Sequence, residues 1–356
     1  MTALAPLGPD DRLLILAPHP DDETIATGVL IQVALQAGAA LRIVFATDGD
    51  NNPWPQRWIE RRWHIGARER ARWGERRRQE VSAALRVLGV DAQATRFLGW
   101  PDQGLTERLM RDDEAVTILA GEIRAFAPTH VALPALADRH PDHGALRVLG
   151  DLALLRAECT ATRLSYVIHG DGSPVDAYVA PGDEARLQCK RQALLAHASQ
   201  LVLSRQRMLG LAGQPERFDI LDAAGSLPPV QKVGVCIRIA YRPGHGWRRR
   251  RDLLLVLVTH EETMRFRFVL PRWVTRGSRV ALDAGRGRVF QAQWAENTWI
   301  LTLPQQAAPL LAIYVKLDRR WPRLILFDKE CWHEGASLLP GGAEASFEAR
   351  TQGSQS

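Results

Sequence analysis

The first half of the chain alternates short apolar runs with segments of helical periodicity, and this alternation restricts the fold more than any other feature. The apolar runs are expected to be buried strands and cover residues 13–17, 41–46, 95–98, 130–133 and 164–168. Apolar residues three and four positions apart predict helices over residues 24–37, 75–88, 114–126, 145–155 and 184–198. Strands that alternate with helices form a parallel sheet covered on both faces. The pattern therefore predicts a Rossmann-like, mostly parallel α/β domain.

The pattern changes after about Ile220, where the apolar residues begin to alternate with polar ones. Met264, Phe266 and Phe268, for example, alternate with arginines, as in a half-buried strand. Strands are expected over residues 233–240, 253–259, 264–270, 279–283, 289–294, 299–303, 311–317 and 324–327. We predict an α/β domain over residues 1–224 and an all-β sandwich over 225–340. Residues 341–356 are mostly small and polar and are expected to be a disordered tail.

Two short segments rich in histidine and aspartate follow predicted strands. The first is Ala17-Pro18-His19-Pro20-Asp21-Asp22-Glu23, directly after the first strand, and the second is His140-Pro141-Asp142-His143, shortly after the fourth. In an open α/β sheet, ligands bind beyond the carboxyl ends of the strands, where the strand order reverses. A strand order of 3-2-1-4-5 makes strands one and four neighbours, so both segments would meet in one crevice.

Together the two segments supply three histidines and three aspartates. Two imidazoles and one carboxylate, with a position left for water, suit a catalytic zinc ion, which activates water and polarises a carbonyl oxygen. The remaining residues match the need of an amide hydrolase for a general base and for hydrogen-bond donors. The four cysteines form no C-x-x-C pair, so metal ligands must be histidine and carboxylate. Asp22 could instead merely cap the following helix, but two such segments at strand ends favour a site.

The paired segments resemble the PIG-L/LmbE-type de-N-acetylases, whose members deacetylate N-acetylglucosaminyl-phosphatidylinositol and the precursors of mycothiol and bacillithiol. The family motif A-H-P-D-D-E corresponds to residues 17–23, with Pro18 standing directly before the histidine, and H-x-D-H is intact at residues 140–143. The resemblance covers roughly residues 12–220. It implies a zinc-dependent hydrolase that removes the acetyl group from an N-acetylated sugar or glycoconjugate and releases acetate and a free amine.

The resemblance also implies a role for each residue of the two segments. Asp21 would be the general base. His140 would stabilise the oxyanion or protonate the leaving amine, and Asp142 would orient that histidine and tune its charge. Three residues would bind one zinc ion per chain, with another divalent metal as the alternative: His19, Asp22 and His143.

Four further residues are candidates for substrate binding. Arg77 matches a substrate-contacting arginine of the family, although neighbouring arginines also fit a solvated helix face. Asp48 follows the second strand and should border the crevice, although an Asp-Gly turn explains it equally well. Trp54 opens an arginine-rich segment, residues 54–78, which would be either a sugar-stacking rim or a packed aromatic core. His169, after the fifth strand, would line the cleft.

Several other classes of protein are disfavoured. The net charge is +6, but the basic run at residues 247–251 is accompanied by no nucleic-acid motif and is read as a solvated loop. No apolar run is long enough to cross a bilayer and no signal peptide is recognised, so a cytoplasmic location is expected. Two alternative functions stay open, a metal-dependent phosphoesterase-like hydrolase and a non-catalytic carbohydrate-binding protein. The identity of the sugar, the role of the β-rich domain and the oligomeric state are also open.

Overall fold

The structure is a computed structural model that describes residues 6–170, 178–221, 236–240, 251–270, 279–283, 289–295, 298–302, 310–319, 331–334 and 344–347. It divides into two compact units, Met1–Ala224 and Gly225–Ser356. The strand expected over residues 324–327 and most of the basic run at 247–251 lie outside the described residues. Of the helices in the described part of the chain, none is long and apolar enough to cross a membrane.

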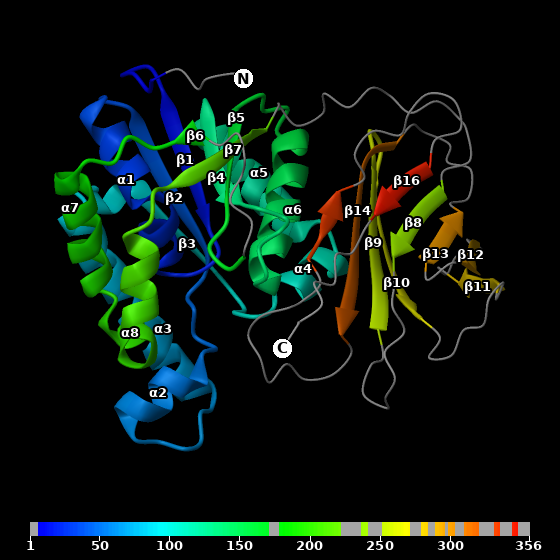
Figure 1. Ribbon diagram of the computed structural model, residues 1–356, viewed down its shortest axis with the longest axis horizontal. Coiled ribbons are helices and arrows are strands. Elements are labelled where there is room, and N and C mark those ends of the chain that lie inside the picture. Colours follow the sequence, from blue (N-terminus) through cyan, green and yellow to red (C-terminus); the bar gives the residue numbers. More distant parts are fainter. Residues whose placement is uncertain are drawn as a thin grey trace, which may run out of the picture. The chain divides into compact units, whose positions relative to one another are not determined.

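The first unit is built on a mostly parallel sheet with the strand order β3-β2-β1-β4-β5-β7-β6 (Figure 1). The parallel strands are β1 (Arg12–Ala17), β2 (Ala40–Thr47), β3 (Thr95–Trp100), β4 (His130–Pro134) and β5 (Thr162–Tyr166). Two strands complete the sheet, β6 (Tyr178–Val179) and β7 (Arg217–Leu221), and β7 runs antiparallel to both of its neighbours. The expected order of the first five strands is confirmed, so β1 and β4 are hydrogen-bonded neighbours.

Helices cover both faces of this sheet, as predicted (Figure 1). One layer contains α1 (Asp22–Gln36), α3 (Ala67–Val87), α7 (Glu184–Leu195) and α8 (Ala198–Ala212), which contact one another. The other contains α4 (Leu105–Arg111), α5 (Glu114–Phe126) and α6 (Pro141–Arg156), which also contact one another. A short helix, α2 (Pro53–Glu60), follows β2 and contacts α8.

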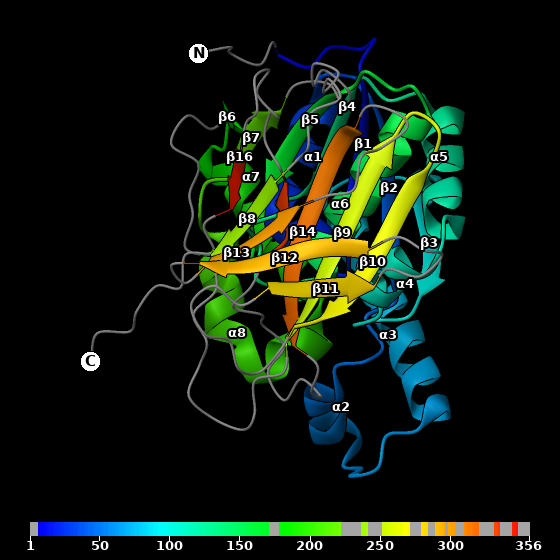
Figure 2. The ribbon, with the colours of Figure 1, turned by 90° about the vertical axis from the view of Figure 1, so that its right-hand side faces the viewer.

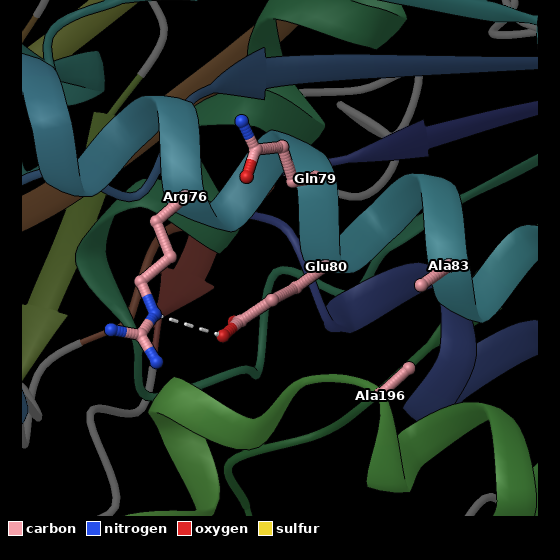
Figure 3. Close-up of a pocket in the computed structure, with 5 residues that line it drawn as sticks. All are labelled: Arg76, Gln79, Glu80, Ala83 and Ala196. Carbon is pink, nitrogen blue, oxygen red and sulfur yellow. Dashed lines mark hydrogen bonds and ion pairs between the residues drawn. The ribbon is translucent and has the colours of Figure 1, made fainter.

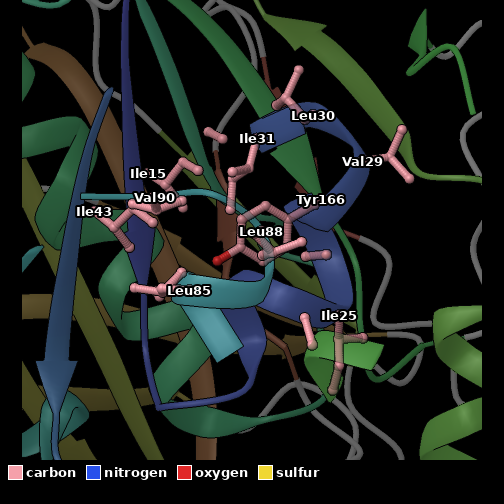
Figure 4. Close-up of a cluster of buried hydrophobic side chains, with 14 of the residues drawn as sticks. Ile15, Ile25, Val29, Leu30, Ile31, Ile43, Leu85, Leu88, Val90 and Tyr166 are labelled. Atoms are coloured by element: carbon pink, nitrogen blue, oxygen red, sulfur yellow. The ribbon is translucent and has the colours of Figure 1, made fainter. Parts of the chain in front are cut away.

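Buried aliphatic side chains fix the sheet against the first helix layer (Figure 4). Ile15 of β1 and Ile43 of β2 pack with Ile31 of α1 and Leu85 of α3, and all four are at most 3% exposed. Burying each such side chain contributes about 1.5–3 kcal/mol. Tyr166 of β5 also donates from its hydroxyl to the carbonyl of Leu16, at 2.8 Å. This packing fixes both ends of the loop that joins β1 to α1 and carries the first histidine–aspartate segment.

The helices differ from the predicted ones in one way that matters for the site. α6 begins at Pro141, not at residue 145, because proline fits the first turn of a helix and His140 caps it by accepting the N–H of Asp142. Asp142 and His143 therefore lie in the first turn of a helix. The helix expected over residues 184–198 is α7, which ends at Leu195, and the helix α8 that begins after His197 was not predicted. The helices α2 and α4 were not predicted, since both are short and α2 contains prolines.

The second unit is an all-β structure, as predicted, and its two sheets share one apolar core. The strands β11 and β12 run across the direction of β9 and β10 (Figure 2), an arrangement known from orthogonally packed sandwiches. The aromatic rings of Phe266, Phe268 and Phe290 meet inside this core. One sheet contains β10 (Thr263–Val269), β9 (Arg251–Thr259), β14 (Leu310–Arg319) and β15 (His333–Glu334). The other contains β11 (Arg279–Asp283), β12 (Val289–Ala295), β13 (Thr298–Thr302), β8 (Cys236–Ala240) and β16 (Glu344–Phe347).

The tail expected to be disordered contains a strand in the structure. Residues Glu344–Phe347 form β16, which pairs in parallel with β8. The composition of the tail did not indicate this strand, because its partner lies about a hundred residues earlier in the chain and strand pairing at that separation leaves no local signal. The rest of the tail lies outside the described residues.

A buried ion pair ties the helix layer of the first unit together. Lys190 of α7 is fully buried, and its Nζ donates to Glu216 Oε1 at 2.7 Å. The same carboxylate accepts the backbone N–H groups of Val29 and Leu30, in the middle of α1, at 2.7 and 2.9 Å. Charges removed from water are tolerated only when they are paired and hydrogen-bonded in this way. The pair therefore joins α1, α7 and the segment before β7.

We expect Lys190→Met to lower the free energy of unfolding by about 3–5 kcal/mol, because it leaves the Glu216 carboxylate buried without its cation. Arg191→Met is the matched control on the same helix. It breaks an exposed pair with Glu184 and should cost less than about 1 kcal/mol. Denaturant unfolding of the two variants, followed by circular dichroism, makes the comparison, and equal losses would contradict the role of the buried pair.

Candidate metal centre and active site

A cluster of histidines and aspartates lies at the carboxyl ends of the parallel strands. The loop after β1 and the segment after β4 contribute most of it, and the loops after β3 and β5 complete it. All members except the half-buried His169 are at most 9% exposed. The members are His19, Asp21, Asp22, Asp102, Asp138, His140, Asp142, His143 and His169.

The carboxylate of Asp22 joins the two predicted segments. Its Oδ2 lies 3.1 Å from His19 Nδ1 and 3.2 Å from His143 Nε2, and it also accepts the backbone N–H of His19 at 3.0 Å. Asp22 is the first residue of α1, and the N-cap position belongs to Asp21, whose side chain makes no capping hydrogen bond. The interpretation of Asp22 as a simple helix cap is therefore wrong.

Two further carboxylates face the other side of the His19 ring. His19 Nε2 lies 3.2 Å from Asp102 Oδ1 and 3.4 Å from Asp142 Oδ2. The backbone N–H of Asn51 donates to Asp102, and the backbone N–H groups of Gln103 and Leu105 donate to Asp142, at 2.7–3.1 Å. These hydrogen bonds orient both carboxylates. Burial disfavours a charged His19, but hydrogen bonds to the three carboxylates outweigh it and hold the pKa of His19 well above its ordinary value.

Asp138 orients His143 from the side opposite to Asp22. Its Oδ2 lies 3.1 Å from His143 Nδ1 and accepts the backbone N–H groups of Ile168 and His169, while its Oδ1 accepts that of His140. Burial disfavours a charged His143, but the charges of Asp138 and Asp22 outweigh it and raise the pKa of His143 to about 10. Both nitrogens of this fully buried ring therefore face carboxylates.

His140 differs from its neighbours because it is held in a neutral form. Burial, reinforced by the charges of the neighbouring histidines, lowers the pKa of His140 well below its ordinary value. Its Nδ1 accepts the backbone N–H of Asp142 at 3.2 Å, so the ring proton must be on Nε2. The ring centroid of His140 lies 4.6 Å from that of His19. His140 can therefore donate a hydrogen bond from Nε2 into the cluster.

The donor set fits a divalent metal ion. Within the described structure, neither ring nitrogen of His143 has hydrogen-bond geometry with its carboxylate, although Nδ1 lies 3.1 Å from Asp138 and Nε2 lies 3.2 Å from Asp22. Buried polar atoms normally have a well-aligned partner. Ligand atoms of His19, His140 and His143 lie within 4.8 Å of one another, as do those of Asp22, His143 and His169, and those of His19, Asp102 and Asp142. Imidazole and carboxylate ligands of this kind suit zinc.

Arg77 is buried, so its interpretation as part of a solvated helix face is wrong. Its guanidinium donates to the carbonyls of Gly49 and Pro20 and lies 3.2 Å from Asp21 Oδ2. Gly49 has a φ of +60°, and a Cβ there would lie 1.7 Å from Arg77 Nη1, so only glycine fits. Burial raises the pKa of Asp21 to about 6, although the charge of Arg77 opposes the shift.

The other candidate residues have partners of their own. Asp48 accepts two hydrogen bonds from Arg78, at 2.6 and 2.8 Å. Trp54 is 52% exposed on α2, and the guanidinium carbon of Arg57 lies 5.0 Å from its ring centroid. His169 Nδ1 lies 3.2 Å from Arg207 Nη2, and its ring centroid is 5.1 Å from that of His143. Whether these residues contact a substrate remains a prediction.

The segment that contains Trp54 is largely helical and does not form the packed aromatic core considered as an alternative. It forms α2 and the first half of α3, which meet through hydrogen bonds such as that from the Gln56 amide to the Glu69 carbonyl, at 2.7 Å. Trp73 is buried, whereas Trp58 and Trp63 are 69% and 81% exposed. Only one of the four indoles is therefore a core residue, and three are available at the surface.

The structure assigns Asp142 a different contact from the expected one and adds two residues that were not predicted. Its backbone N–H contacts His140, whereas its carboxylate faces His19. Asp102 and Asp138 were missed, although each follows a predicted strand within a few residues of its end, as the identified segments do. That position was the available signal, but single aspartates in loops are too common to be singled out.

The part of the chain that contains this cluster is similar to known proteins. Residues 14–154, which include both histidine–aspartate segments, match a family model described as GlcNAc-PI de-N-acetylase (PIG-L). The 1D-myo-inositol 2-acetamido-2-deoxy-alpha-D-glucopyranoside deacetylase of Mycobacterium sp. (strain JLS) is 30% identical over 48% of this chain and 59% of that protein. The protein of the same name from Mycolicibacterium paratuberculosis is 38% identical over 37% of this chain and 47% of that protein. The chain thus spans about half the length of these curated relatives.

The chain is also similar to a protein of solved structure. The N,N'-diacetylchitobiose deacetylase of Pyrococcus horikoshii is 18% identical, with a TM-score of 0.48 and coverage of 60% of this chain and 84% of that one.

We expect Asp138→Asn to weaken the binding of a divalent metal ion roughly 10- to 100-fold, because it removes the charge that orients and polarises the His143 ring. Asp151→Asn is a matched control, since Asp151 is a buried aspartate of α6 that pairs with Arg147 and Arg163. Competition of each folded variant with a chelating dye gives the affinities. An unchanged affinity for Asp138→Asn, or an equal loss in both variants, would contradict this role.

Proposed function

The chain carries a domain of the PIG-L family, and on that premise we propose that it is a zinc-dependent hydrolase acting on an N-acetylated sugar or glycoconjugate. The reaction would cleave the acetamide bond and release acetate and a free amine. The observation that carries the proposal is the contact of Asp22 with both His19 and His143, directly beside the buried carboxylate of Asp21. The names of the curated relatives, which specify a 2-acetamido-2-deoxy sugar, support this class of substrate.

His19, Asp22 and His143 are the proposed ligands of one zinc ion. In support of this set, Asp22 Oδ2 lies within 3.2 Å of one ring nitrogen of each histidine, and the residues come from the loop after β1 and the first turns of α1 and α6. A divalent metal ion bound here would polarise the acetyl carbonyl and lower the pKa of a water molecule. Asp102, Asp138 and Asp142 would hold the imidazole rings in place, since carboxylates behind metal-bound histidines orient them and increase their basicity.

Asp21 is the proposed general base. It is the first of the paired carboxylates, and Arg77 orients it through the 3.2 Å contact between the guanidinium and Oδ2. In this role the Asp21 carboxylate accepts a proton from the attacking water. The buried position of Asp21 favours proton transfer, because burial makes the carboxylate more basic than an exposed one.

His140 is the proposed donor to the oxygen that becomes negative as water adds to the carbonyl. Its proton on Nε2 is in position because the N–H of Asp142 occupies Nδ1. A donor placed before the reaction needs no reorganisation as charge develops. The leaving amine must also be protonated. Either His140 or Asp21, once it has taken the proton from water, would supply that proton.

The first experiment is a screen of N-acetylated glycans for released amine, with zinc content measured on the same protein. We expect about one zinc per chain, amine release from at least one N-acetyl sugar, and loss of activity after treatment with a chelator. Phosphate release from sugar phosphates without amine release would favour the phosphoesterase alternative. Glycan binding without turnover by the zinc-loaded protein would favour a carbohydrate-binding protein.

We expect Asp21→Asn to retain zinc and to lose on the order of 10²–10⁴ in kcat, since asparagine has the same size but cannot accept the proton. Zinc analysis and steady-state kinetics on the best substrate of the screen measure both quantities. Asp151→Asn is the control, since it changes a buried aspartate that pairs with arginines outside the cluster. Near-normal turnover by zinc-loaded Asp21→Asn would exclude Asp21 as the base.

A further inference from the structure

The peptide bond between Pro20 and Asp21 is held at both of its polar ends. Its carbonyl oxygen accepts a hydrogen bond from Arg77, and its N–H donates to Glu23 Oε2 at 2.9 Å. Asp21 has a φ of 101°, a region that residues other than glycine rarely adopt. Turning this peptide over would bring φ of Asp21 to negative values. The two hydrogen bonds therefore hold Asp21 in a conformation that it would otherwise leave.

Glu23 is itself fixed by buried partners. It is fully buried, its Oε1 accepts the hydroxyl of Thr24 at 2.7 Å, and the same oxygen lies 3.3 Å from His197 Nε2. Thr24 Oγ1 also lies 3.3 Å from His197 Nε2, so one ring nitrogen serves both oxygens. Because a buried carboxylate needs several donors, the orientation of Glu23 depends on His197.

His197 lies at the junction of α7 and α8, and that junction is anchored to α3. Glu80 of α3 accepts the backbone N–H and the hydroxyl of Ser199, at 2.9 and 2.6 Å. Figure 3 shows Glu80 beside Arg76, with Ala196 of the junction lining the same hollow. The contact of His197 with Glu23 thus joins the α7–α8 junction to a loop about 170 residues earlier in the chain.

We propose that Glu23, held by His197, is a positioning residue that fixes the carboxylate of Asp21 by clamping the Pro20–Asp21 peptide together with Arg77. The inference rests on the proposed function, because it assigns the clamp to the proposed general base. The direction of a side chain follows its backbone, and a displacement of about 1 Å in a reacting group can cost on the order of 10²-fold in rate. Neither Glu23 nor His197 is required as a metal ligand in this arrangement.

The kinetic test compares Glu23→Ala, Glu23→Gln and His197→Ala with Glu122→Ala, which removes a glutamate of α5 that pairs with Arg42 and Arg96. We expect Glu23→Ala to lower kcat on the order of 10²-fold with unchanged zinc content and KM. Glu23→Gln keeps an oxygen for the Asp21 N–H and should recover much of the loss. His197→Ala should lower kcat less than Glu23→Ala, and Glu122→Ala should leave it unchanged.

A double variant tests whether the two clamps act on the same peptide. Arg77→Met and Glu23→Ala release the same peptide, so their combined loss of kcat should be well below the product of the single losses. If Glu23→Ala does not fold, Glu23→Met, which keeps the volume but has no acceptor oxygen, takes its place in every comparison. Independent, fully multiplicative losses would overturn the shared clamp.

A crystal structure of Glu23→Ala separates this inference from the proposed function. We expect the Pro20–Asp21 peptide to be turned and φ of Asp21 to be negative, whether or not an N-acetyl substrate has been found. An unchanged peptide together with a normal kcat would overturn the positioning role. Failure of every N-acetyl sugar in the screen would overturn the proposed function alone, because the geometry of the variant still reports on the clamp.

Discussion

The rest of the site depends on the contacts that the Asp22 carboxylate makes with two histidines. This carboxylate lies between His19 and His143, which come from the two ends of the matched domain and meet only because β1 and β4 are neighbours in the sheet. The apolar packing of the sheet against α1 fixes one segment, and the helix start at Pro141 fixes the other. Three other carboxylates, those of Asp102, Asp138 and Asp142, then surround the imidazoles, so the region concentrates negative charge where a cation would sit.

Most of the architecture could be predicted from periodicity because the strands of the first unit are nearly continuous apolar runs and its main helices carry clear turn signals. The strand order 3-2-1-4-5 was assumed from the general organisation of open α/β sheets, and the meeting of the two motifs followed from it. The errors have physical causes. The helix expected from residue 145 begins at Pro141, because proline is favoured in the first turn of a helix. β16 depends on pairing with β8, and such a distant partner leaves no mark in the local sequence.

The site residues could be predicted where several polar residues are adjacent in the sequence, and much less well where a contributing residue is isolated in the sequence. His19, Asp22 and His143 belong to dense motifs, whereas Asp102 and Asp138 are isolated aspartates whose importance comes from the histidines that folding brings to them. Arg77 stands in a run of arginines, and the available signal was its helical spacing, four residues before the buried Val81 on the same face of α3. The buried guanidinium fits only because Gly49 has no side chain, since a Cβ there would lie 1.7 Å from Arg77 Nη1.

The ion pair of Lys190 and Glu216 has a consequence for the order of events during synthesis. Glu216 accepts backbone N–H groups of α1 although it lies 187 residues after Val29, so it leaves the ribosome long after the helix that it completes. Translation proceeds at about 5–20 residues per second, which leaves the nascent helix without this partner for on the order of ten seconds or more. The loop that carries His19 and Asp21 thus emerges early, while one of the contacts that secures the adjoining helix arrives only when the first unit is nearly complete.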